Sequence, residues 1–341
     1  MRIGIVGAGS WGTALAQTLS IAGCEVALWA REPWVAEQLA AARRHPWALP
    51  GVELVAEAHV THDLARAVDG VRVVILAVPS HAMRDTVSAC ASHLRDCIVV
   101  SAAKGFEMGT GLTMTEVIAD AVGGQRLAGI AALSGPNIAI EVARGLPAAT
   151  VVATSDPSVG ATVRDGCAGG SLRIYSSEDV VGVEYAGALK NVVAIAAGIC
   201  DGIGAGDNGK AALITRGIAE IARAGVRAGA HPMTFAGLAG IGDCMVTCMS
   251  PYSRNRGLGE SIGRGTSVAD EMESGQMVVE GVNATRAAKL LSRRHGVDMP
   301  IADEIHAVLF EGKKVASALS DLMTRGAGDE LRGLGIRVGT I

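Results

Sequence analysis

Two lysines are the side chains best suited to move a proton. Lys190 lies in a segment, residues 183–195, that is apolar on nearly every face of a helix, so we expect it to be buried. Loss of solvation disfavours the charged form of an amine, which makes a buried lysine a usable proton donor or acceptor. Lys104 follows an apolar strand-like segment and is expected at the ligand-binding edge of a sheet. The structural alternatives stay open: a snorkelling or ion-paired Lys190 and a solvated Lys104.

A second group of polar residues lies between positions 243 and 256. Asp243 and Thr247 are one helical turn apart. Ser253 has the residue type and position of an N-cap, and Arg254 and Asn255 follow it at the start of a helix. Free N–H groups and a forked arginine suit a phosphate. An ordinary capped helix with surface arginines would explain the same residues.

A glycine-rich turn lies near the start of the sequence. The motif G-x-G-x-x-G is formed by Gly7, Gly9 and Gly12, with apolar residues 3–6 before it and a helical pattern after it. In such turns the first glycine permits the tight bend, the second lets a pyrophosphate approach, and the third lets helix and strand pack closely. The position between a strand and a helix favours dinucleotide binding over a purely structural turn.

The elements around these residues alternate in the first half of the chain and then become helical. We expect strands at 2–6, 24–29, 71–78, 97–102, 129–134 and 149–154, with helices such as 11–22, 82–93 and 112–122 between them. Alternation of this kind predicts a doubly wound parallel sheet. From residue 180 we expect helices at 180–200, 209–229, 267–273, 281–295, 301–311 and 314–325, and a frayed tail at 326–341.

These patterns predict an α/β protein with two domains. An N-terminal Rossmann-like doubly wound parallel sheet at 1–178 would bind the dinucleotide, and a C-terminal all-helical domain at 179–341 would hold the substrate and the catalytic residues. Ser134-Gly135-Pro136-Asn137 follows a strand of the first domain and offers free N–H groups to a ligand. Closure of the two domains is expected during the reaction.

Composition limits the classes of partner. The formal net charge of −4 and the absence of a basic excess argue against nucleic acid as a ligand. Seven cysteines without a C-x-x-C pair indicate free thiols in a reducing cytoplasm, and no nearby histidine completes a metal set with Cys244 and Cys248. The longest apolar run, residues 191–200, is shorter than the ~20 residues that span a membrane, so no integral membrane association is expected. A homodimer stays open.

Taken in order, these segments resemble the bacterial NAD(P)-dependent glycerol-3-phosphate dehydrogenase family over nearly the whole chain. The segments that carry the resemblance are Gly7-Ala8-Gly9-Ser10-Trp11-Gly12, Ala77-Val78-Pro79-Ser80, Lys104-Gly105-Phe106-Glu107, Leu133-Ser134-Gly135-Pro136-Asn137, Gly187-Ala188-Leu189-Lys190-Asn191, Ala211-Ala212-Leu213-Ile214-Thr215-Arg216-Gly217, Gly237-Leu238-Ala239-Gly240-Ile241-Gly242-Asp243, Ser253-Arg254-Asn255-Arg256 and Glu280-Gly281-Val282. One departure is Ala48, which stands where the family often has a tyrosine, and it leaves open any cofactor contact at that position.

The resemblance implies a role for each matching residue. The cofactor would be bound by Gly7, Gly9, Ser10, Trp11, Gly12, Arg31, Lys104, Ala139, Arg254, Val278 and Glu280. The substrate, dihydroxyacetone phosphate or sn-glycerol 3-phosphate, would be bound by Lys104, Gly135, Asn137, Lys190, Asp243, Ser253, Arg254 and Asn255. Lys190 would donate or accept the proton, Lys104 would add a second positive charge, and Asp243 would orient Lys190. The product would supply glycerophospholipid synthesis.

The residues also bear on the choice between NADP(H) and NAD(H) and on two competing functions. Arg31, at the expected end of the second strand, favours a 2′-phosphate and thus NADP(H), while the adjacent Glu32 keeps NAD(H) open. A dehydrogenase of the same architecture for a 3-hydroxy acid or a ketopantoate-like substrate would need a carboxylate site instead. A cofactor-binding sensor without turnover would need neither Lys190 nor Lys104.

Overall fold

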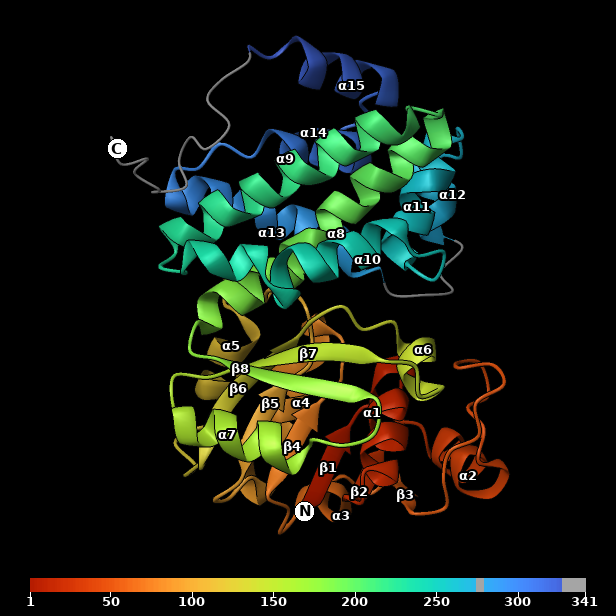
Figure 1. Cartoon of the computed structure of the whole chain (residues 1–341), viewed down its shortest axis with the longest axis vertical. Helices are drawn as coiled ribbons and strands as arrows, with labels where there is room; N and C mark the ends of the chain where they lie inside the picture. Colours follow the sequence, from red (N-terminus) through yellow and green to blue (C-terminus); the bar gives the residue numbers. More distant parts are fainter. Residues whose placement is uncertain (274–278, 327–341) are drawn as a thin grey trace. The chain divides into compact units, whose positions relative to one another are not determined.

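The computed structural model describes residues 1–273 and 279–326, which form two compact units (Figure 1). One unit contains Met1–Lys104 and Leu112–Val180. The other contains Gly105–Gly111 and the chain from Val181 onward. A short segment directly after Lys104 therefore belongs by its contacts to the unit formed by the C-terminal half of the sequence.

The first unit is built on one eight-stranded sheet with the order β3-β2-β1-β4-β5-β6-β7-β8. Its strands are β1 (Arg2–Val6), β2 (Glu25–Trp29), β3 (Ala58–Thr61), β4 (Val73–Leu76), β5 (Ile98–Ser101), β6 (Gly129–Ser134), β7 (Ala148–Ala153) and β8 (Leu172–Ser177). All neighbouring pairs are parallel except β6 and β7. The order reverses between β1 and β4, which is the switch point where ligands of such sheets bind.

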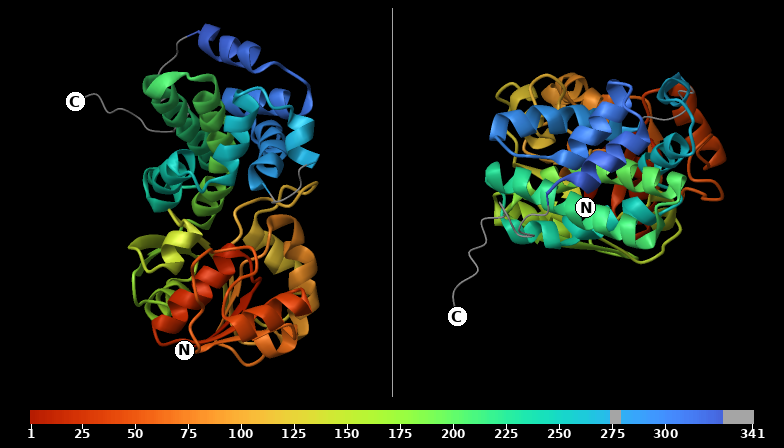
Figure 2. Two further views of the ribbon diagram at one scale, coloured as in Figure 1. Left: turned by 90° about the vertical axis from the view of Figure 1, so that its right-hand side faces the viewer. Right: turned by 90° about the horizontal axis from the view of Figure 1, so that it is seen from above.

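Two layers of helices cover this sheet, and helices lie on both sides of the strands in the left view of Figure 2. The helices are α1 (Ser10–Ile21), α2 (Pro33–Ala42), α3 (Leu64–Val68), α4 (Met83–Cys90), α5 (Met114–Ala121), α6 (Ala139–Ala143) and α7 (Pro157–Gly166), with short 3-10 turns at Ser80–Ala82 and Ala91–His93. Apolar residues of α1, α2 and α7 form the core on one face, and those of α3, α4 and α5 form the core on the other. The nearly continuous apolar strands follow from this coverage of both faces.

The second unit is built from helices, apart from the segment 105–111 and the loops between the helices. Its helices are α8 (Val180–Ile203), α9 (Gly206–Arg227), α10 (Asp243–Met249), α11 (Arg254–Gly263), α12 (Val268–Glu273), α13 (Glu280–His295), α14 (Pro300–Phe310) and α15 (Val315–Thr324), with short turns at Pro232–Ala236 and Leu238–Gly242. The central helix, α8, is long and apolar enough to cross a membrane, but 89% of its most apolar window is buried inside the protein. It is therefore the core helix of this unit, and its burial explains its composition.

The sequence predictions agree with most of this architecture. All six predicted strands are present, and the α/β class with a helical second half is confirmed. The predicted parallel sheet has one antiparallel pair, because the connection after β6 returns β7 antiparallel to it. The strands β3 and β8 were not predicted, since both are edge strands with few buried residues. The predicted fraying of the tail concerns residues that, apart from Gly326, lie outside the described ones.

Candidate functional site

The glycine turn is closely packed at two of its glycines and open at the middle one. A side chain at Gly12 would lie 1.8 Å from the carbonyl oxygen of Gly7, and Gly7 itself has a φ of +114°. A side chain at Gly9, in contrast, would meet nothing within 4 Å. Helix α1 begins at Ser10 with no side-chain cap, so its first N–H groups are available to an anion. Close packing at two glycines and open space at the middle one are what pyrophosphate binding requires.

Other predicted cofactor residues surround this turn. Trp11 is half-buried and packs with Ala139 against a small cluster that includes Ala48. Arg31 follows β2 and is 79% exposed at its side chain. Its Nε donates to Glu32 Oε1 at 3.0 Å, and the structure gives it no contact with another predicted site residue among those described. An exposed guanidinium at the end of β2 is accessible to a ribose phosphate.

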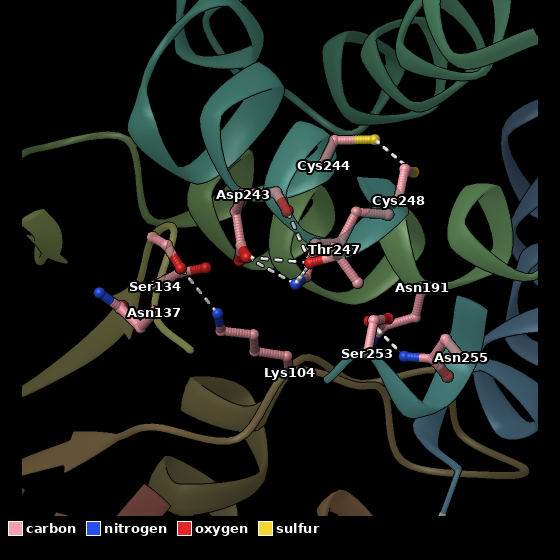
Figure 3. Close-up of polar contacts among 12 residues, drawn as sticks. Lys104, Ser134, Asn137, Asn191, Asp243, Cys244, Thr247, Cys248, Ser253 and Asn255 are labelled. Carbon is pink, nitrogen blue, oxygen red and sulfur yellow. Dashed lines mark hydrogen bonds and ion pairs between the residues drawn. The ribbon is translucent and has the colours of Figure 1, made fainter. Parts of the chain in front are cut away.

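Lys104 and the turn after β6 form one hydrogen-bonded group in the sheet unit. The Lys104 ammonium donates to the carbonyl oxygen of Gly135 at 3.0 Å. The side-chain amide of Asn137 donates to Ala149 O at 3.0 Å, which fixes this turn against β7. The amide oxygen of Asn137 is buried without a protein partner, so it remains an acceptor for a ligand. Figure 3 shows Lys104 directed at this turn.

The helical unit buries an ion pair between Lys190 and Asp243. The Lys190 side chain is 7% exposed and that of Asp243 is 2% exposed, and Nζ lies 2.6 Å from Asp243 Oδ1. Lys190 also donates to the hydroxyl of Thr247. The Thr247 hydroxyl in turn donates to the main-chain oxygen of Asp243 at 2.6 Å. Figure 3 shows Asp243 and Thr247 on the same side of α10. The predicted burial of Lys190 is confirmed.

This arrangement leaves capacity for a third partner of the amine. An ammonium carries three N–H donors, and the structure uses two of those of Lys190. A buried charge is costly unless it is paired and hydrogen-bonded, so Asp243 and Thr247 make the ammonium tolerable there. Asp243 is the first residue of α10, where a carboxylate is favoured by the helix dipole. The result is a held cation with one donor left for an oxygen of a ligand.

The start of α11 lies against α8 in the same unit. Ser253 is its N-cap, and its hydroxyl accepts from Arg256 N at 3.2 Å, which confirms the predicted helix start. Asn255 donates to the amide oxygen of Asn191 at 2.9 Å and accepts from Gly281 N at 2.9 Å. Figure 3 shows Asn255 pointing at Asn191, the residue after Lys190. Arg254 is exposed at the first position of the helix.

Four glycines bring α8 and α11 into backbone contact. A side chain at Gly198 would lie 2.0 Å from Arg256 O, and one at Gly259 would lie 2.0 Å from Ile195 O. Gly202 and Gly263, one turn further along each helix, are also crowded by the backbone of the other helix, with nearest distances of 2.4 and 2.6 Å. The crossing therefore admits no larger residue, and it fixes the start of α11 relative to α8.

Of the two remaining predicted cofactor residues, only Glu280 lies in the described part of the chain. Glu280 is the first residue of α13, and Val278 lies outside the described residues. Sequence reasoning missed Asn191, which its place beside Lys190 could have signalled. It also missed His45, whose ring nitrogen Nε2 lies 2.7 Å from the carbonyl oxygen of Ala8 in the glycine turn. Nothing in the local sequence of His45 indicates this bond.

The cysteines give no sign of metal or disulfide chemistry in the described residues. All seven are free and buried. The sulfur atoms of Cys244 and Cys248 are 3.9 Å apart, and the hydrogen bond to Cys248 together with burial raises the pKa of Cys244 well above its usual range. Among the residues that the structure describes, no group of three or more histidine, cysteine, aspartate or glutamate side chains could hold a metal ion.

Comparisons with known proteins match both halves of the chain to one protein family. Residues 2–160 match the family model of the NAD-dependent glycerol-3-phosphate dehydrogenase N-terminus, and residues 179–320 match that of the C-terminus. A glycerol-3-phosphate dehydrogenase [NAD(P)+] of Pelotomaculum thermopropionicum is 46% identical over 331 residues, which cover 97% of this chain and 95% of the relative. One from Chlorobium limicola is 48% identical and covers 95% of this chain and 98% of the relative.

A solved structure agrees with the sequence matches. The crystal structure of a glycerol-3-phosphate dehydrogenase from Coxiella burnetii has a TM-score of 0.90 to this chain at 33% identity. The match covers 95% of this chain and 99% of that one. Both halves of the chain, and not the nucleotide-binding half alone, therefore share the fold of that dehydrogenase.

Proposed function

The chain belongs to the NAD-dependent glycerol-3-phosphate dehydrogenase family, and on that premise we propose how its own residues carry out the reaction. It is an oxidoreductase that uses NAD or NADP. The reaction is the reversible reduction of dihydroxyacetone phosphate to sn-glycerol 3-phosphate. The observation that carries the assignment of residues is the buried pair of Lys190 and Asp243, with one donor of the amine unused.

The dinucleotide is held by the sheet unit in this proposal. The turn of Gly7, Gly9 and Gly12 and the first N–H groups of α1 would bind the pyrophosphate, since the space at Gly9 is open. Arg31 would bind a 2′-phosphate, which favours NADP(H), and its partner Glu32 would accept the ribose hydroxyl of NAD(H). When bound, the reduced nicotinamide supplies the hydride that the ketone carbon accepts.

The proton comes from Lys190. Hydride addition places negative charge on the ketone oxygen, and the third N–H of Lys190 donates to that oxygen as the charge develops. A preorganised donor of this kind in a dry site contributes roughly 3–4 kcal/mol to the transition state. Asp243 and Thr247 keep the amine oriented and charged until the proton leaves. Lys104, held at Gly135 O, adds a second positive charge.

The phosphate of the substrate is assigned to the start of α11. Arg254 offers a forked guanidinium, and the N-terminus of a ten-residue helix favours an anion. Ser253 and Asn255 contribute by fixing this turn, because their side chains already bond within the unit. Asn137 offers a free amide oxygen to a substrate hydroxyl. These contacts position the ketone without taking part in bond changes.

The wider organisation is part of the same proposal. Residues 1–178 act as the dinucleotide-binding domain and residues 179–341 as the substrate and catalytic domain. The chain forms a homodimer, works in the cytoplasm and supplies glycerophospholipid synthesis; its partner molecules are small metabolites. Seven buried free thiols support a reducing compartment. Sedimentation at several concentrations measures the dimer directly.

The substrate assignment is tested with one ketone at a time. The purified protein is mixed with NADPH, and the loss of reduced-nicotinamide absorbance is followed with dihydroxyacetone phosphate, dihydroxyacetone, ketopantoate and a 3-oxo acid. We expect turnover with the phosphorylated ketone and far slower turnover with the others. Faster reduction of a carboxylate substrate would contradict the proposal and favour the rival dehydrogenase. Tight NADPH binding without reduction of any ketone would favour a sensor.

A further inference from the structure

We propose that Trp47 and Trp34 form the surface against which the adenine ring of the bound dinucleotide packs. The inference rests on the dinucleotide binding proposed above and adds two residues to it. It assigns the aromatic contact to Trp47, which neighbours Ala48, the position at which this chain departs from the family's tyrosine.

Two exposed indoles side by side need an explanation. Trp47 is 64% exposed and Trp34 is 49% exposed, and their ring centroids are 5.1 Å apart. The chain has only four tryptophans, and the other two are partly buried. Trp11 packs into an apolar cluster, and Trp29 donates its indole N–H to His62 O at 3.0 Å. Large apolar side chains that stay together at a surface mark binding sites.

One end of the pair is tied to the glycine turn. The Nδ1 atom of His45 accepts from the backbone N–H groups of Trp47 and Ala48, at 3.3 and 3.0 Å. Since Nδ1 is an acceptor, Nε2 carries the hydrogen and donates to Ala8 O at 2.7 Å. Burial lowers the pKa of His45, which agrees with a neutral ring. The loop with Trp47 is therefore fixed directly to the residue between Gly7 and Gly9.

The other end of the pair adjoins the expected ribose position. Trp34 is the second residue of α2 and lies three residues after Arg31, at the end of β2. In dinucleotide-binding sheets the adenosine ribose lies at the end of this strand and the pyrophosphate at the first helix. A base attached to that ribose meets the surface beside it. The pair is thus connected at one end to Ala8, through His45, and at the other end to the chain that follows Arg31.

The ring of Trp47 is held ready for this contact. His45 packs against it edge-on, with ring centroids 4.9 Å apart, while Trp34 lies at a tilt of 53° on it. Ala48 turns inward and is only 9% exposed, in a cluster with Ala14 and Leu49. The aromatic side chain that this loop offers to a ligand is therefore Trp47. Stacking of a base on an aromatic side chain typically stabilises binding enough to be measured by alanine substitution.

The test uses ligands that contain or lack the base. Calorimetry measures binding of ADP-ribose 2′-phosphate, which contains adenine, and of nicotinamide mononucleotide, which does not. Trp47→Ala should weaken binding of the first ligand by on the order of tenfold to a hundredfold and leave the second unchanged. Trp34→Ala should have a smaller effect in the same direction, and Trp47→Phe should recover most of the affinity. Trp29→Phe is the matched control and should bind both ligands as wild type does.

The outcomes distinguish a direct contact with the adenine ring from a purely structural role of the two indoles. Folded Trp47→Ala and Trp34→Ala variants could still bind ADP-ribose 2′-phosphate with an affinity within twofold of wild type. That result would overturn the proposed contact of the adenine ring with the two indoles, while the proposal of dinucleotide binding would stand. Equal losses for both ligands would also overturn it, because they would show that the indoles only shape the loop. Thermal melting of each variant reports folding. If wild-type protein bound neither NADPH nor ADP-ribose 2′-phosphate, the proposed function would fail first.

Discussion

The sheet unit forms its part of the site by leaving side chains out, whereas the helical unit forms its part by burying charged ones. At Gly9 the space is open, and Gly7 and Gly12 allow the backbone to close around it. At Lys190 and Asp243 two charges lie among apolar residues of α8 and α10. In our proposal the first arrangement would bind an anion with backbone dipoles, which any dinucleotide could use. The second buries an ion pair, which is costly in stability, and in our proposal it would act in one reaction. Binding and chemistry should therefore be separable by mutation.

The largest effect is expected at Lys190. Lys190→Ala removes the proton donor, and turnover should fall by about two to three powers of ten, since a preorganised donor contributes roughly 3–4 kcal/mol. The dissociation constant for NADPH, measured by fluorescence, should not change, because the bonds of Lys190 lie in the helical unit. Loss of the amine leaves Asp243 buried without its cation, so the double variant with Asp243→Ala controls for stability. A double variant that melts normally and still turns over substrate would remove Lys190 from its role.

The glycine turn should show the opposite behaviour. Gly12→Ala forces a side chain onto Gly7 O, which should cost about 1–3 kcal/mol of stability and most of the NADPH affinity. Gly9→Ala meets nothing in the protein, so its melting temperature should match wild type while NADPH binding weakens. Calorimetry and thermal melting measure the two quantities side by side. Normal NADPH affinity in Gly9→Ala would show that the phosphate does not use this space.

A smaller effect is expected at Arg254. Arg254→Ala removes a charged hydrogen bond to the substrate, so the KM for dihydroxyacetone phosphate should rise about tenfold to a hundredfold, from roughly 1.5–3 kcal/mol. The rate with dihydroxyacetone, which has no phosphate, should change little. Arg264→Ala is the control, since Arg264 caps the far end of the same helix. Equal responses of the two ketones would exclude Arg254 as the phosphate ligand.

The last prediction concerns stability against pH, and no effect on catalysis is expected from it. Burial raises the pKa of Glu220 to about 8, although its carboxylate accepts from Ile301 N and Ala302 N at the start of α14. A folded pKa above the ordinary 4.5 means that the folded state binds the proton more tightly. The contribution of Glu220 to the free energy of unfolding is therefore complete below pH 4.5. It is lost as the pH rises to about 8, by at most about 1.4 kcal/mol per pH unit.

Glu220→Gln removes this titration and keeps one acceptor oxygen. Chemical denaturation across that pH range should give a flatter stability profile for the variant than for wild type. Parallel profiles would mean that the carboxyl group of Glu220 does not titrate in this range in the folded protein. The wild-type protein is the reference, because all other titrating groups are common to both.

The sequence allowed some of these features to be predicted because their causes are local. The glycine turn, the apolar strands and the cap at Ser253 each depend on neighbours within a few residues. The edge strands β3 and β8 escaped because their exposed positions carry no apolar pattern. The contacts of residues 105–111 were also hidden. Phe106 packs on Tyr185, and Arg294 donates to the carbonyl oxygen of Thr110, at separations of 79 to 184 residues that no local pattern reports.

The candidate site shows the same limit. The burial of Lys190 followed from its apolar surroundings, but nothing near it in sequence identifies Asp243, 53 residues away, as its partner. The resemblance to the family brought the two residues into one site, while residue patterns alone did not. His45 is a further case, since a lone histidine before a proline gives no indication that it binds the glycine turn. Pairings between distant segments depend on the tertiary fold.

The glycine contact between α8 and α11 has a consequence for substrate choice. Backbone contact at these glycines leaves no side chain that could readjust there, and the hydrogen bond from Asn255 to Asn191 adds a further tie, so we expect the two helices to move as one body. The amine on α8 and the first turn of α11 are thereby kept at a constant separation. A ligand that contacts both the Lys190 amine and the first turn of α11 must therefore have a length that matches their separation. In our proposal a short phosphorylated ketone spans this separation, which a longer or shorter ketone would not match.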